Sequence, residues 1–295
     1  GIAKDLNKMS AKSAVRLLVP KEEAVALYRW IAILTGSKNA LKGVGFFLGA
    51  IMLDAWGFRG AIAVMASVLA TVWLLSMCVL QRGFGKSSVK PKFQHLFSKS
   101  HPVNCLSGAR LFLFAARDVW FVIALPVYLS SVLCWEHWTV GAFLACWVIG
   151  YGIVQSFAPR ITGGRDAAVP DGRAAFIWAM FLLLVPAIIA VAITTGTAVQ
   201  LSLVAGLMVF GALFAVNSAL HSFLIISYAD EDGVSLDVGF YYMANAMGRL
   251  LGTVLSGWVY QTWGLSSCLW ISSAMIGICA LVSLMLPTHK DVLAS

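Results

Sequence analysis

Long apolar runs alternate with short polar connections along most of this chain. A helix needs about 20 apolar residues to cross a bilayer, and runs of that order fall at 27–53, 60–80, 104–131, 138–158, 174–194, 199–227, 239–262 and 265–286. Residues 1–19 predict a further helix, too polar to be recognised as a span by hydropathy, and Pro20 ends it. The pattern predicts an all-α polytopic membrane protein.

Composition agrees with a membrane protein. The 295 residues are 60% hydrophobic and 12% charged, whereas a soluble domain is about 25% charged. The six cysteines are scattered, without a CxxC pair or a Cys/His cluster, so we expect buried small side chains, no metal site and no cofactor. The chain starts at Gly1 without a signal-peptide pattern, and we expect an upstream part to be missing.

Lysine and arginine are distributed unevenly among the connections. The connection at 81–102 carries five cations and no acid, and the one at 159–173 carries three arginines, whereas the alternate connections hold only Arg59. The positive-inside rule then places 81–102, 159–173, 228–238 and the C-terminus in the cytoplasm, in a multi-pass protein of the inner (plasma) membrane. Topology thus explains the net charge of +8, and we expect no nucleic acid partner. Gly85-Lys86-Ser87 lacks the first glycine and the strand of a phosphate-binding P-loop.

An internal repeat links the two ends of the chain. KGVGFFLGAIMLDAWG (42–57) aligns with RLLGTVLSGWVYQTWG (249–264), which pairs Lys42 with Arg249 and matches two Trp-Gly dipeptides. Repeated helical bundles are typical of secondary transporters. We expect 1–80 to end an N-terminal half (about helices 4–6), 81–102 to be a central loop, and 103–295 to be a six-helix half (helices 7–12). About nine of twelve helices would then be present.

Two GxxxG pairs in the repeat predict close helix packing rather than chemistry. They are Gly45 with Gly49 and Gly248 with Gly252.

The predicted helix at 1–19 carries its charges on one face. Lys4, Lys8, Lys12 and Arg16 follow each other at intervals of four, with Asp5 among them, so all lie within a sector of about 120°. Such a helix either lies on the membrane surface or lines a wet cavity.

Further charges lie inside the predicted spans. A charge at mid-bilayer costs about 2.5–3.5 kcal/mol on insertion scales, so it normally faces a wet cavity and marks function. Cations outnumber acids in the predicted membrane helices, with Asp5 and Asp118 set against Lys4, Lys8, Lys12, Lys38, Lys42, Arg110, Arg117 and Arg249. The excess predicts an anionic small-molecule substrate with at least two negative charges. Arg110 alternatively serves as an interfacial anchor.

Several polar residues complete the candidate site. We expect Asp5 to pair with Lys8 and Asp118 to pair with Arg117. Asn217 is a further candidate for substrate binding. Asp5, Asp118 and His221 are candidates for proton coupling or charge pairing, although His221 could instead be a hydrogen-bonded interior histidine.

Three segments resemble a known family. GIAKDLNKMSAKSAVRLLVP, YRWIAILTGSKNALKGVGFFLG and ARLFLFAARDVWFVIALPVYL resemble the ArsJ-type organoarsenical efflux permeases of the major facilitator superfamily. The resemblance runs over the whole chain, from the fourth to the twelfth helix of such a carrier. It implies export of 1-arseno-3-phosphoglycerate, and hence arsenate resistance. It also implies a functional link to the glyceraldehyde-3-phosphate dehydrogenase that makes this ester.

Two other functions remain open at this point. The same cations suit import or exchange of phosphate esters or other multiply charged organic anions. A membrane enzyme acting on anionic lipid would need a nucleophile with a base or a metal cluster, and Ser10, Ser13 and Ser37 have no histidine nearby in the sequence. We therefore predict a secondary active exporter, an antiporter in the lipid bilayer that works as a monomer, and not an enzyme.

Overall fold

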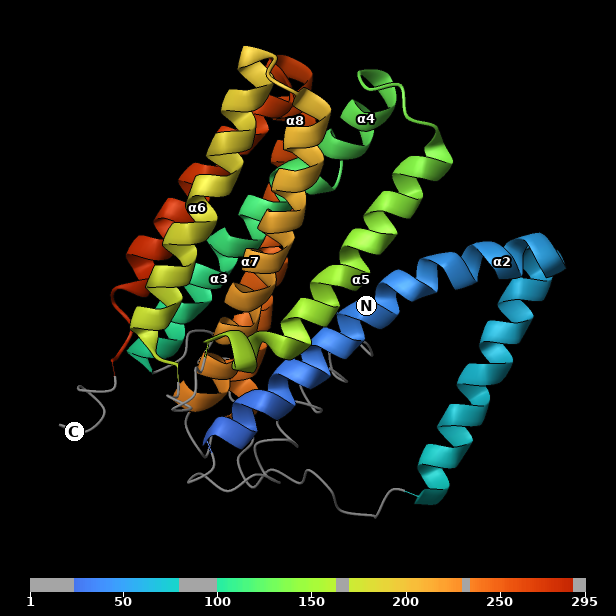
Figure 1. Cartoon of the computed structure of the whole chain (residues 1–295). Coiled ribbons are helices and arrows are strands. Elements are labelled where there is room, and N and C mark those ends of the chain that lie inside the picture. Colours follow the sequence, from blue (N-terminus) through green and yellow to red (C-terminus); the bar gives the residue numbers. More distant parts are fainter. Residues whose placement is uncertain (1–23, 80–99, 163–169, 230–233, 289–295) are drawn as a thin grey trace.

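The structure is a computed structural model that describes residues 24–79, 100–162, 170–229 and 234–288. Within those ranges the regular elements are all helices (Figure 1): α2 (Ala24–Val79), α3 (His101–Phe121), α4 (Ala124–Ser131), α5 (His137–Thr162), α6 (Gly172–Thr195), α7 (Val199–Tyr228) and α8 (Val234–Ser283). By length and composition, six helices in the described part of the chain are able to cross a membrane. The prediction of an all-α polytopic membrane protein is confirmed. The predicted helix at 1–19 lies outside the described residues.

Two of these elements, α2 and α8, are each a pair of helices joined at a glycine. Gly57 has φ 63° and ψ 178°, and Gly264 has φ 77° and ψ −176°. A positive φ is favourable for glycine because no Cβ clashes with the backbone. Gly57 and Gly264 are the aligned glycines of the two Trp-Gly dipeptides, so the two copies of the repeat turn with the same backbone conformation.

The bundle has two distinct ends. We call the end where α2 begins, α5 ends and α6 begins the loop end, which lies at the bottom of Figure 1. The opposite end, with α4 and the turns at Gly196 and Gly264, is called the turn end. By the positive-inside prediction, the loop end is the cytoplasmic one.

Glycines bring α8 close to α3. A Cβ atom on Gly252 would lie 2.6 Å from the carbonyl oxygen of Ala115, and one on Gly248 would overlap the carbonyl of Leu111. Ser272 Oγ adds a 2.7 Å hydrogen bond to the carbonyl oxygen of Ala116. The packing role predicted for this GxxxG pair is confirmed.

A second glycine contact joins the first part of α2 to α5 toward the loop end. A Cβ on Gly36 would overlap the side chain of Ser156, and one on Gly152 would overlap the backbone of Ala40. Nearby, the hydroxyls of Tyr28 and Thr162 lie 3.1 Å apart. The packing predicted for Gly45 and Gly49 is not seen among the described residues, where added Cβ atoms would meet no neighbour within 4 Å.

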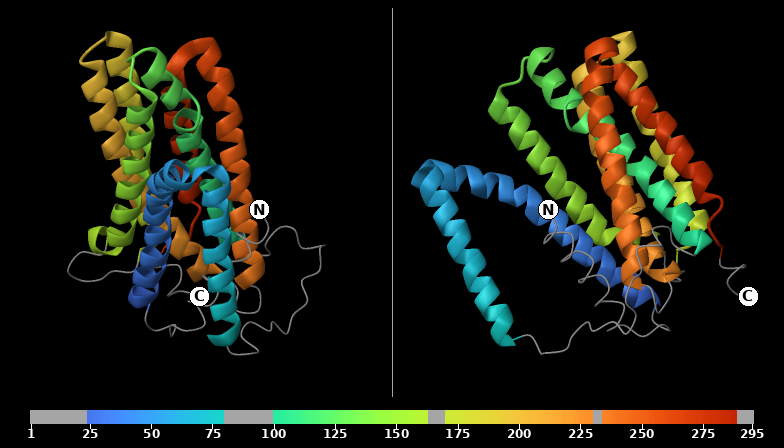
Figure 2. Two further views of the ribbon diagram at one scale, coloured as in Figure 1. Left: turned by 90° about the vertical axis from the view of Figure 1, so that its right-hand side faces the viewer. Right: turned by 180° about the vertical axis from the view of Figure 1, so that it is seen from behind.

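The second part of α2, residues 58–79, stands apart from the bundle (Figure 2). Only 6% of its most apolar window is buried, and large apolar side chains such as Leu69, Trp73 and Met77 are exposed. A helix that is apolar all round suits hydrocarbon or other helices rather than water.

Candidate substrate-binding site

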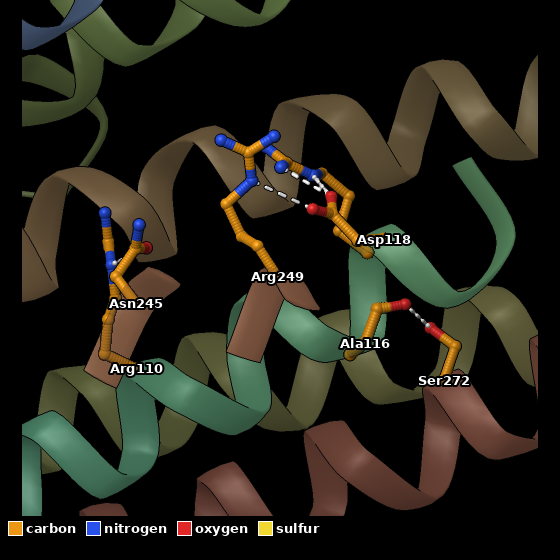
Figure 3. Close-up of polar contacts among 7 residues, drawn as sticks. Arg110, Ala116, Asp118, Asn245, Arg249 and Ser272 are labelled. Carbon is orange, nitrogen blue, oxygen red and sulfur yellow. Dashed lines mark hydrogen bonds and ion pairs between the residues drawn. The ribbon is translucent and has the colours of Figure 1, made fainter. Parts of the chain in front are cut away.

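Asp118 on α3 lies between two arginines. The Nε of Arg117 donates to its Oδ1 at 2.6 Å, and the Nε of Arg249 on α8 donates to its Oδ2 at 2.9 Å (Figure 3). Asp118 is fully buried, whereas the side chain of Arg249 is 49% exposed. The predicted Arg117–Asp118 pair is confirmed. One carboxylate serves two guanidinium groups, so this cluster keeps a positive charge.

Helix packing explains how Arg249 reaches Asp118. Gly252 follows Arg249 by about one turn of α8, and a Cβ there would lie 2.9 Å from the Cβ of Asp118. The absence of that Cβ lets α8 approach α3 at this level. The GxxxG spacing therefore serves the site through the position of the helix.

A cavity of about 480 Å³ lies beside this cluster, among α2, α3, α5 and α8. Its charged lining consists of Lys42, Arg117, Arg249 and Asp118, with His137 at one side. His137 and Trp138 are exposed at the first turn of α5, so the cavity lies toward the turn end. The aromatic part of its wall is formed by Phe47, Phe121, Trp138, Trp147 and Tyr151.

The aromatic wall is held in place by its own contacts. Trp147 Nε1 donates to the carbonyl oxygen of Leu207 at 2.8 Å, and its ring stacks on Tyr151 with centroids 5.9 Å apart. A wall fixed in this way needs little reordering when a ligand arrives.

Arg249 presents unused donors to the cavity. Its Nε is bonded to Asp118, but among the described residues neither Nη1 nor Nη2 has a hydrogen-bond partner. Figure 3 shows this outer edge of the guanidinium pointing away from Asp118. Two parallel N–H donors on a planar cation match the oxygens of a phosphate, arsenate or carboxylate group.

Arg110 lies outside the lining of the cavity, in a buried polar network. Its Nε donates to Asn245 Oδ1 and its Nη1 to the carbonyl oxygen of Ser218, both at 3.2 Å. Gln155 Nε2 meets the hydroxyl of Ser218 at 3.1 Å, and Asn39 Nδ2 donates to Gln155 Oε1 at 2.6 Å. Because Asn39 also lines the cavity, the network connects the cavity wall with Arg110.

The other candidates from the sequence lie elsewhere. Lys38 is exposed on α2 and does not line the cavity. Asn217 is buried and donates to the carbonyl oxygens of Trp178 and Leu213, both at 3.0 Å. His221 is buried, and neither ring nitrogen has a hydrogen-bond partner among the described residues. Lys4, Asp5, Lys8 and Lys12 lie outside the described residues.

The structure thus brings together Lys42, Arg117, Asp118 and Arg249, and places Arg110 in an adjoining network. Gln155 was not predicted to belong to the site. Its amide inside the apolar run at 138–158 is nevertheless a signal of a functional or buried polar contact, because polar groups at membrane depth are costly. The aromatic wall has no such signal, because aromatic residues are frequent throughout the chain.

Comparisons with known proteins support the fold. No protein-family model matches the chain, and no curated protein sequence matches it. A solved structure that is similar to it is the crystal structure of a bacterial homologue of the iron transporter ferroportin in an outward-facing state. The TM-score is 0.69 at 15% sequence identity, over 91% of this chain and 65% of that one. The chain spans about two thirds of the length of this neighbour.

A structural likeness at this identity defines a fold. The chain is an all-α, multi-pass membrane protein with a fold of the major facilitator type.

Proposed function

We propose that the protein is a secondary active carrier for an organic oxyanion. The observation that carries this proposal is the charge of the cavity, where Lys42, Arg117 and Arg249 are set against Asp118. An excess of cations around a cavity inside the bundle favours an anion as the transported molecule, because a bound anion lowers the cost of keeping those charges in the membrane. The same excess repels cations, so a metal ion such as the iron of the ferroportin neighbour suits these residues poorly.

The internal repeat adds an argument for a substrate with two anionic groups. Lys42 and Arg249 are aligned positions of the repeat, and both line the cavity. Each half of the carrier thus contributes a cation to one space. We infer that Arg249 and Arg117 bind one oxyanion group through N–H donors, while Lys42 acts as a point charge toward the other. Lys4, Lys8 and Lys12 remain predicted cavity residues.

The resemblance to the ArsJ-type permeases suggests the particular substrate. We propose export of 1-arseno-3-phosphoglycerate across the inner membrane, with the loop end in the cytoplasm. The carrier would act together with a glyceraldehyde-3-phosphate dehydrogenase and confer arsenate resistance. A phosphate ester carried by import or exchange is the second candidate, because its oxygens would use the same donors.

We propose that Asp118 takes part in coupling transport to its energy source. The carboxylate of Asp118 and an incoming oxyanion compete for the guanidinium of Arg249, since that group already donates to Asp118. Binding therefore changes the pairing of the acid that faces the cavity. Asp5 and His221 remain the other candidates for coupling.

Transport into everted vesicles that contain the full-length carrier tests the proposal. We expect uptake of labelled arsenate only when glyceraldehyde-3-phosphate dehydrogenase and its substrates are present. Uptake of 3-phosphoglycerate without uptake of the arsenate product would favour the second candidate. Absence of uptake for both anions would exclude the anion-carrier proposal.

Matched variants locate the site within the same assay. Arg249→Gln removes a cation that lines the cavity, whereas Arg160→Gln removes an exposed arginine outside it, beside the ring of Phe157. Loss of one charge-assisted contact corresponds to about a tenfold loss of affinity. We expect that loss for Arg249→Gln only. Equal loss in both variants would remove Arg249 from the site.

A further inference from the structure

Arg110 is a buried cation that forms no ion pair with an acid in the described part of the chain. It is 4% exposed, and among the described residues its hydrogen bonds go to neutral acceptors, the side chain of Asn245 and the backbone of Ser218. A buried charge that lacks a counter-charge is costly, and inside a membrane protein it commonly marks function. Neutral helix contacts alone give no reason for an arginine at this position.

His221 supplies a second, independent observation in the same region. Its side chain is fully buried, and within the described part of the chain both ring nitrogens lack a hydrogen-bond partner. On α7, His221 follows Ser218, the residue whose carbonyl oxygen accepts from Arg110, by about one helical turn. A buried polar group without a partner requires an explanation, and a ligand that is absent from the structure is one.

Phe114 lies between Arg110 and Arg117, the latter a residue that lines the cavity. Its ring centroid lies 4.0 Å from the Cζ of Arg110 and 4.9 Å from the Cζ of Arg117, so one ring contacts both cations. Phe114 stands between the two arginines along α3, which are two helical turns, or about 10 Å, apart in rise. Figure 3 shows Arg110 with Asn245 to the left of Asp118 with Arg249, at earlier turns of α3 and α8.

We propose that Arg110, Asn245 and His221 form a second anion-binding position, the inner position, and that Phe114 gates it from the outer position at Arg117 and Arg249. The ligand is an oxyanion group of the transported molecule, such as a phosphate. This inference rests on the proposed anion transport. During export the anion passes from the inner position to the outer one when Phe114 moves aside, and during exchange it passes in both directions.

The polar network connects the inner position to the contact between α2 and α5. Arg110 and Gln155 bind the same residue, Ser218, and Gln155 accepts a hydrogen bond from Asn39. An anion that draws Arg110 away from Ser218 therefore disturbs the link from α5 and α7 to α2. Occupation of the inner position thereby favours separation of α2 and α5 at the loop end.

The test compares binding with transport in the full-length carrier, with 3-phosphoglycerate as the probe. Arg110→Gln keeps an N–H donor at the position of Nε, toward Asn245, but removes the charge. We expect binding from the turn-end side to stay within about threefold of wild type, while transport falls at least about tenfold. Arg249→Gln should lose both. Arg110→Lys should recover part of the transport, because a point charge still binds an anion.

Each other outcome has a defined meaning. Transport by Arg110→Gln within about threefold of wild type would assign Arg110 a structural role and overturn the inner position. Loss of binding equal to that of Arg249→Gln would place Arg110 in the outer position. It would then overturn the distinction between an inner and an outer position. Failure of the wild-type protein to transport 3-phosphoglycerate or the arsenate ester would overturn the proposed function itself, before any variant is compared.

A second variant tests the proposal in case Arg110→Gln folds poorly. Asn245→Ala removes an acceptor of Arg110 without burying a new charge. The same pattern, with binding retained and transport reduced, is expected. Unchanged transport by Asn245→Ala would contradict the proposal.

Discussion

At the scale of single residues, the site depends on how one buried carboxylate is shared. Asp118 accepts from both Arg117 and Arg249, and burial makes each of these hydrogen bonds hard to replace with water. The adjacency of Arg117 and Asp118 made their pairing predictable from the sequence. The participation of Arg249, 131 positions further along, depends on helix packing and could not be predicted in that way.

The shared carboxylate makes Asp118→Asn a test of stability. The variant leaves two guanidinium groups without a counter-charge. Removal of one partner from a buried ion pair costs about 3–5 kcal/mol, and because Arg249 is half exposed we expect the low end of that range. Thermal unfolding of the detergent-solubilised protein measures the loss. Added phosphate should restore part of it by occupying the place of the carboxylate, and an unchanged midpoint would contradict this account.

Lys42 and Lys38 have similar positions in the sequence pattern but different positions in the structure. Both lysines lie within one apolar run, four residues apart, so the sequence gives no reason to assign them different roles. Only Lys42 lines the cavity. We expect Lys42→Gln to reduce transport about tenfold, as for the loss of a charge-assisted contact, and Lys38→Gln to have little effect. Equal effects in initial-rate measurements would mean that Lys38 also faces the transport path.

At the scale of helices, glycines decide which faces meet. The α3–α8 contact uses the GxxxG pair that the spacing predicted, whereas α2 approaches α5 through Gly36 and Gly152 rather than Gly45 and Gly49. Spacing shows that a helix has a flat face, but the rotation of the helix decides which partner that face meets. The apolar runs themselves predicted the helices closely, because length and hydropathy are local properties.

The α2–α5 contact is open to a test with a matched pair of glycines. A Cβ atom on Gly152 would overlap the backbone of Ala40, whereas a Cβ atom on Gly150 would meet no described neighbour within 4 Å. Overpacking costs about 1–3 kcal/mol, so Gly152→Leu should separate the helices at the loop end and Gly150→Leu should not. A cross-link between cysteines introduced at Tyr28 and Thr162, in a background without native cysteines, reports the separation. Equal cross-linking in both variants would contradict this role.

At the scale of the whole molecule, the two copies of the repeat share a turn and a cation. Gly57 and Gly264 have matching backbone angles, and Lys42 and Arg249 line the same cavity. The alignment of 42–57 with 249–264 predicted that these segments correspond. It could not predict that their cations would face one space, because the arrangement of the two halves depends on contacts far apart in the sequence.

The charge of the cavity has a consequence for energy supply. Lys42, Arg117 and Arg249 exceed Asp118 by two charges, and one elementary charge moved through 100 mV of membrane potential is worth about 2.3 kcal/mol. In the proposed carrier, a bound dianion cancels that excess, so the loaded step is electrically silent, while the return of the empty carrier moves positive charge.

We therefore expect the membrane voltage to drive the empty carrier back and so to set the direction of net transport. Vesicles with the voltage clamped by potassium and valinomycin should show net transport of a dianionic phosphate monoester that depends on voltage, and exchange that does not. The same voltage dependence in both modes would mean that other charges move with the carrier. In the expected case, the resting voltage of the cell supplies free energy for net transport by this protein.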